Sequence, residues 1–108
     1  MPINVVKAFE HLPGVTKSKL FYLDGKGLDG SENHNSVHSW TRAERMATES
    51  GIGKLVEWWA ENQNSAFYAS TTGSDAILWL DMDSGKRLGR CAHEARRTKN
   101  DLAELLGD

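Results

Sequence analysis

The chain has 108 residues, of which 39% are hydrophobic and 26% are charged, and its formal net charge is −2. This length and composition suit one globular domain spanning residues 1–108, and they leave little room for a second domain or a deep cofactor pocket. No apolar run approaches the roughly 20 residues of a membrane span, and the first residues lack the pattern of a signal peptide, so we expect neither.

The first third of the chain predicts a helix, a strand and a loop. Residues 3–12 fit either a helical face or the start of a strand, and we favour a helix that ends at a proline–glycine turn. Residues 20–23 are apolar and aromatic and precede an Asp-Gly turn, so they predict a strand. Residues 25–36 are polar and rich in glycine, which predicts a flexible loop and a candidate binding segment.

The middle of the chain predicts helices. Thr41 and Glu44 have the spacing of a capping box, so a helix is expected to begin at Thr41. A second helix, or the continuation of one kinked helix, is predicted by apolar residues spaced at i, i+3, i+4 and i+7, namely Ile52, Leu55, Val56 and Trp59.

The last part of the chain predicts three strands and a helix. Residues 66–71, 76–82 and 87–91 are strand candidates separated by turn signals, and the most apolar of them, 76–82, is expected at the centre of the sheet. A helix is predicted over residues 92–106. Because helices and strands come in blocks, we expect an α+β fold with an antiparallel meander of three to four strands packed against two to four helices.

No motif for a cofactor or a metal has the context that it needs. A G-x-G-x-x-G pattern at residues 25–30 does not open into a predicted helix, as a dinucleotide site requires. His34 and His38 share a spacing that can bind zinc, but the only other soft ligands, Cys91 and His93, are not spaced as a zinc motif. We therefore expect no cofactor and no metal. As the single cysteine, Cys91 excludes an internal disulfide, so a reducing, cytoplasmic location is expected.

Charge is distributed unevenly along the chain. Residues 86–99 carry a net charge of +5, whereas residues 1–85 carry −4. This basic segment is either a solvated face or a surface for nucleic acid or an acidic protein. Tryptophans supply a second set of candidates: Trp40 and Trp58 are either interface anchors or core residues. The candidate binding residues are Trp40, Trp58, Lys86, Arg87, Arg90, His93, Arg96 and Arg97.

These patterns favour a non-enzymatic interaction module that binds, or binds and inhibits, a larger protein or protein complex, as small proteins of phages and other mobile elements do. The first alternative is a nucleic-acid-binding protein that uses the basic segment. The second is a small metal-independent ribonuclease or hydrolase that uses histidines from among His11, His34, His38 and His93. No membrane partner is expected, and the sequence alone does not define an oligomeric state.

Overall fold

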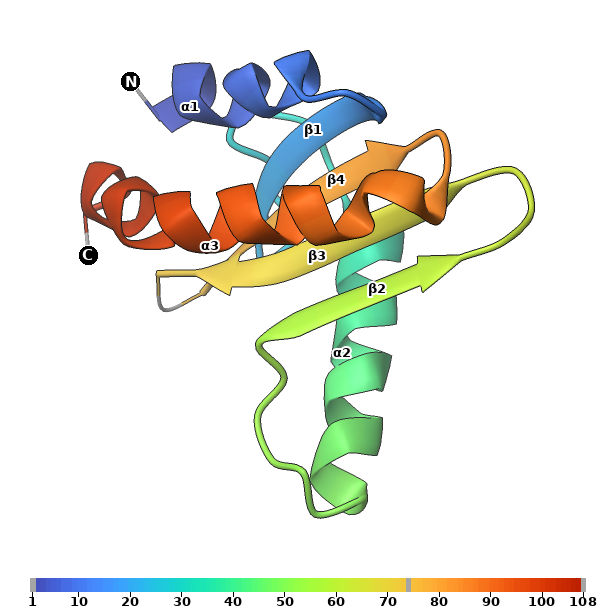
Figure 1. Cartoon of the computed structure of the whole chain (residues 1–108). Coiled ribbons are helices and arrows are strands. Elements are labelled where there is room, and N and C mark those ends of the chain that lie inside the picture. Colours follow the sequence, from blue (N-terminus) through green and yellow to red (C-terminus); the bar gives the residue numbers. More distant parts are fainter. Residues whose placement is uncertain (1, 74, 108) are drawn as a thin grey trace.

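A four-stranded antiparallel sheet organises the chain in the computed structural model, which describes residues 2–73 and 75–107 (Figure 1). The strands lie in the order β1-β4-β3-β2, and their bounds are β1 Val15–Tyr22, β2 Glu57–Glu61, β3 Ala66–Thr72 and β4 Ala76–Met82. The predicted α+β class is confirmed. The meander is also confirmed, because β2, β3 and β4 pair consecutively, and β4 lies inside the sheet as expected.

Helices cover both faces of this sheet. Their bounds are α1 Pro2–Ala8, the 3-10 turn η1 Phe9–His11, α2 His34–Glu49, the 3-10 turn η2 Gly85–Arg87 and α3 Leu88–Leu105. In Figure 1, α3 lies in front of the sheet with α1 above it, and α2 crosses behind the strands. Among the described residues, no helix is long and apolar enough to cross a membrane.

Alternation along the strands divides the apolar residues between two cores, because neighbouring side chains point to opposite faces. On the α1–α3 face, residues such as Tyr68 and Leu80 pack against Leu102 of α3. On the α2 face, Trp40 packs with a smaller aromatic group that includes Phe21 and Trp79. The second core is small, and the buried residues of α2 are Trp40 and Ala47.

The helix predicted over residues 52–59 is wrong. Gly51 and Gly53 adopt positive φ angles of 79° and 99°, a backbone conformation that ends α2 and redirects the chain. After this turn residues 57–61 pair with β3 as an edge strand. The spacing that suggested a helix is also compatible with a turn followed by a strand, in which Leu55 and Trp58 pack against the core on the α2 face.

Two further boundaries differ from the predictions. The strand predicted over residues 87–91 is wrong, because α3 begins at Leu88 and buries Cys91, Ala92 and Ala95 along one helical stripe. The predicted start at Thr41 is also wrong, because α2 begins at His34 and already buries Trp40 in its second turn. At both places tertiary packing of a helical face outweighs the local turn and capping signals.

Candidate protein-interaction surface

The outer edge of β2 is open. Among residues 2–73 and 75–107, β2 pairs with β3 alone. The Thr71 amide donates to the Val56 carbonyl at 2.9 Å, and the Asn62 amide donates to the Ser65 carbonyl at 2.9 Å. Hydrogen bonds alternate along an antiparallel pair, so the backbone groups of residues 57, 59 and 61 point away from β3. They form a row of donors and acceptors at the sheet edge.

The opposite edge of the sheet, along β1, is closed by the chain itself. The Glu10 carboxylate accepts a hydrogen bond from the Ser18 amide at 2.9 Å. Further along, the Leu28 amide donates to the Leu20 carbonyl at 2.8 Å, and the Tyr22 amide donates to the Lys26 carbonyl at 2.9 Å. The glycine-rich loop therefore runs beside β1 and satisfies its edge. Closing one edge in this way is a common protection against unwanted strand pairing.

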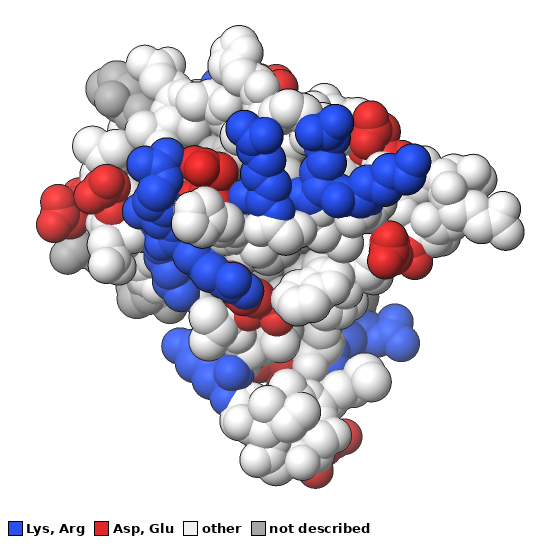
Figure 2. All heavy atoms as spheres, viewed as in Figure 1, with Lys and Arg blue, Asp and Glu red and all other residues white. Residues whose placement is uncertain are grey.

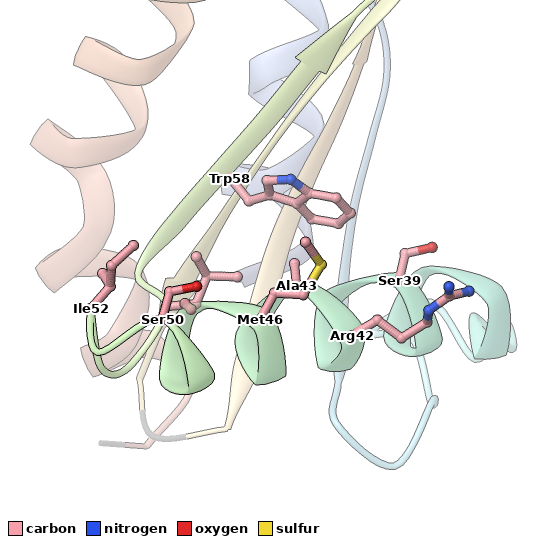
Figure 3. Close-up of a pocket in the computed structure, with 9 residues that line it drawn as sticks. Ser39, Arg42, Ala43, Met46, Ser50, Ile52 and Trp58 are labelled. Carbon is pink, nitrogen blue, oxygen red and sulfur yellow. The ribbon is translucent and has the colours of Figure 1, made fainter.

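Helix α2 extends beyond the open edge. Figure 1 shows its C-terminal half continuing past β2, where the sheet has ended. An apolar cavity of about 570 Å³ lies at this point between α2 and the start of β2 (Figure 3). Met46 and Ile52 line it and are 67% and 78% exposed. Exposed apolar side chains clustered at one place are characteristic of binding surfaces.

Two tryptophans of β2 have different environments. Trp58 faces α2, where its ring packs edge-on against Phe67 and Trp79 at centroid distances of 4.9 and 6.1 Å. Its indole also forms one wall of the cavity (Figure 3). Trp59 points to the other face of the sheet and is 52% exposed. An exposed tryptophan on an open edge is the type of residue that dominates the energetics of protein interfaces.

An ion pair fixes β2 to α3. Arg96 donates from Nε and Nη2 to the two carboxylate oxygens of Glu57, each at 2.7 Å, and the Tyr68 hydroxyl donates to the same carboxylate. The hydrogen bonds from Arg96 hold the pKa of Glu57 below its usual value, while burial and then the Glu57 carboxylate raise the pKa of Tyr68. The edge strand is thereby held in a defined position against α3.

The structure separates the predicted binding residues. Trp40 is only 1% exposed, so it lies in the core, which was the alternative to an interface role. Arg96 is paired with Glu57, and Arg97 is paired with Glu94 at 2.7 Å. Trp58 belongs to the α2 face, whereas the basic segment lies on α3 across the sheet. Trp58 and the arginines therefore do not share one surface.

Four of the predicted basic residues gather at the start of α3. Lys86, Arg87, Arg90 and His93 are all exposed. In the part of the chain that the structure describes, no carboxylate lies within ion-pair distance of Lys86, Arg87 or Arg90. Figure 2 shows lysine and arginine side chains along α3 with acidic groups beside them.

Sequence reasoning missed the residues that form the open edge. Helical periodicity places Trp59 and Ile52 on a buried face, but they lie on the surface, as does Met46 of α2. A signal was present: Glu57 and Glu61 flank two tryptophans, and acidic residues at both ends of a short aromatic run fit an edge strand.

Candidate catalytic chemistry has little support in this geometry. Cys91 is buried, and burial raises the pKa of its thiol, which disfavours the reactive thiolate. Within residues 2–73 and 75–107, no group of three or more His, Cys, Asp or Glu side chains is placed to hold a metal. His34 is exposed, and its nearest acidic neighbour is Glu32 at 3.5 Å.

Comparison with known proteins identifies the fold. No family model matches the sequence, and no curated protein matches it. The gliding protein MglB from Thermus thermophilus superposes with a TM-score of 0.81 at 17% identity, covering 95% of this chain and 86% of that one. A structure described as MglB with tetrameric arrangement gives the same TM-score and identity and covers 95% and 85%.

A roadblock/LC7 domain from Streptomyces avermitilis is also similar, with a TM-score of 0.76, 14% identity and 96% of each chain covered. The chain therefore has the fold of MglB and of the roadblock/LC7 domain. At these identities the likeness establishes the fold.

Proposed function

We propose that this chain is a non-enzymatic protein-interaction module that assembles with a second copy of itself through β2 and the C-terminal half of α2. The open edge of β2, with α2 extending past it, is the observation that carries the proposal. A strand added to β2 would satisfy the outward backbone groups of residues 57, 59 and 61. It would also place the sheet of the second copy beneath the exposed end of α2.

This arrangement is self-complementary. A two-fold axis perpendicular to the sheet would pair β2 with its antiparallel equivalent, and the α2 helices of both copies would then lie side by side. Met46 and Ile52 of each copy would become buried against the other. Because the surface supplies both the protruding helix and the uncovered sheet edge, one kind of chain is sufficient to form the interface.

Two independent features support self-association. Apolar side chains concentrate at the open edge, and their burial is the main favourable contribution to association. A solved MglB structure with the same fold is described as having a tetrameric arrangement, which indicates that this fold is compatible with assembly of identical chains. A larger protein partner, as the sequence suggested, could bind the assembled pair, whereas an inhibitory role and a phage origin stay predictions.

The proposal is tested by measuring the molar mass in solution. Multi-angle light scattering coupled to gel filtration should give twice the chain mass for the wild type. The double variant M46D/I52D should give the mass of one chain, because carboxylates at these positions would be buried without a partner in the assembly. Both side chains are exposed in the single chain, so the variant should keep its fold.

Leu23 and Leu105 provide a matched control. They are 44% and 46% exposed and lie outside the β2 edge and the adjoining cavity. The double variant L23D/L105D should retain the mass of the wild type. A wild type that stays at the mass of one chain at high concentration would contradict the proposal, as would an equal effect of the two double variants.

A further inference from the structure

A groove runs between α1 and α3, on the side of the sheet away from α2. Its floor is a cavity of about 160 Å³ whose apolar lining comes from Val5, Ala8, Phe9 and Leu12. Cavities of this size accept a ligand as large as benzene. The groove therefore has room for one apolar side chain from another molecule.

The α3 side of this groove is basic. Arg97 lines the cavity, and its charge is matched by Glu94 at 2.7 Å. Arg90 lies one turn before Glu94 on the same side of α3. Arg87 continues the row toward β1: its Cδ lies 3.2 Å from the position that a Cβ on Gly14 would occupy. Between Arg87 and Arg97 the row spans roughly 15 Å.

The position of these cations is unfavourable for the helix that carries them. The first turn of α3 has no acidic residue, and α3 continues directly from η2, whose N-terminus is capped by the Ser84 hydroxyl, which accepts a hydrogen bond from the Lys86 amide at 3.4 Å. The partial positive charge at a helix N-terminus repels cations, typically by about 0.3–1 kcal/mol for each exposed charge. Arg87 and Arg90 therefore lie where the helix dipole disfavours positive charge, and natural proteins retain such local costs at functional positions.

We propose that the groove between α1 and α3 binds an acidic segment of a partner protein, with one apolar side chain in the cavity and carboxylates against Arg87 and Arg90. This surface is distinct from the open edge of β2, so it remains available in the self-associated form. The arginine guanidinium suits this role because its planar fork binds carboxylates with two parallel hydrogen bonds.

Several observations favour an acidic peptide over nucleic acid. The chain has a net charge of −2, whereas nucleic-acid-binding domains are usually basic overall. Carboxylates also lie within the row: Glu94 lines the cavity, and the Asp83 carboxylate lies 3.4 Å from the same Cβ position on Gly14 that Arg87 approaches. A duplex presents a negative charge about every 1.7 Å and would meet these groups, while a peptide can avoid them. The apolar lining of the cavity can also be filled by an apolar side chain of a peptide.

The probe is a displayed library of random peptides of about twelve residues, whose helical length of roughly 18 Å matches the row. Selection on the full-length protein should enrich Asp and Glu around one large apolar residue. A selected peptide, labelled with a fluorophore, should then lose at least about tenfold in affinity for R87E/R90E, because both charge partners are reversed. Glutamates in the first turn of α3 are favourable for the helix, so this variant should fold.

Three further variants separate the effects of net charge, of the cavity and of self-association on peptide binding. K17E/K26E changes the net charge by the same amount away from the groove and should bind the peptide as the wild type does. Ala8→Gln, at an exposed position of the cavity mouth, should weaken binding without changing charge. M46D/I52D should bind the peptide with the same affinity as the wild type. Loss of self-association and loss of peptide binding can therefore be observed separately.

Three outcomes would overturn the assignment. The first is a selection that enriches no acidic peptide. The second is a selected peptide that binds R87E/R90E as tightly as the wild type. The third is a duplex of about 20 base pairs that binds more tightly than the peptide at about 150 mM salt and is lost in the same variant, which would assign the row to nucleic acid.

Discussion

The tryptophans differ sharply in what surrounds them. Trp40 is 1% exposed and packs under the sheet, whereas Trp59 is 52% exposed on the open edge. Sequence patterns did not make this distinction, because Trp40 was expected just before a helix and Trp59 on the buried stripe of another. The environment of Trp40 depends on α2 beginning at His34, and that of Trp59 depends on the turn at Gly51 and Gly53 that leads into β2.

Removing these two side chains should therefore have opposite consequences. Trp40→Ala should lower the free energy of unfolding by about 3–5 kcal/mol, the cost of a large core truncation. Trp59→Ala should change the stability of the single chain by no more than about 0.5 kcal/mol, and it should weaken self-association. Urea denaturation of both variants in the M46D/I52D background, which removes the contribution of assembly, measures the first effect.

Equal losses of stability in the two variants would show that Trp59 is packed within the chain. Light scattering on Trp59→Ala alone then measures the second effect. An unchanged mass at all concentrations would remove Trp59 from the proposed interface.

At the scale of elements, sequence patterns predicted the type and bounds of an element well wherever its periodicity agrees with its burial. β3 and β4 are apolar, bounded by turns and buried, and the predicted ranges 66–71 and 76–82 nearly coincide with them. β2 was missed because an edge strand buries one side only, and its few apolar residues also fit a helix. The start of α3 was missed because glycines and arginines there obscure a helical stripe that begins at Leu88.

The link between β2 and α3 gives a prediction about pH. Glu57→Gln should lower the free energy of unfolding at pH 7 by about 1 kcal/mol, because it removes a partly exposed ion pair with Arg96. The pKa of Glu57 is lower in the folded chain than its ordinary value of 4.5. The stabilisation is therefore complete above that value and is lost as the pH falls through the lowered pKa.

Denaturation of wild type and variant between pH 7 and pH 3 checks this dependence. Glu104→Gln, at the exposed end of α3 and away from the proposed interface, is a suitable control and should differ from the wild type by no more than about 0.5 kcal/mol. A difference between wild type and Glu57→Gln that stays constant over this pH range would argue against the ion pair.

At the scale of the whole molecule, two surfaces lie on different sides of one sheet. The open edge of β2 and the end of α2 form the proposed site of self-association, and the groove between α1 and α3 forms the proposed peptide site. The sequence indicated the basic residues of the second surface but not the apolar floor beside them. That floor comes from α1, which meets α3 only through the tertiary fold.

The proposed self-association would link folding to concentration. Binding that stabilises the folded chain raises the temperature of unfolding as the protein becomes more concentrated. We expect the midpoint of thermal unfolding of the wild type to rise by several degrees over about a hundredfold increase in concentration. The midpoint of M46D/I52D should stay constant, and scanning calorimetry or fluorimetry over the dilution series measures both. A wild-type midpoint independent of concentration would contradict assembly.

The closure of β1 has a consequence for how far such a chain can grow. A sheet with two open edges can add copies indefinitely, and this is the route to fibrils. Here Glu10 and the loop beside β1 occupy one edge, so pairing at β2 uses up the remaining edge of each copy. In the proposed assembly, edge-to-edge growth would therefore stop at a closed pair, because the glycine-rich loop prevents strand addition at β1.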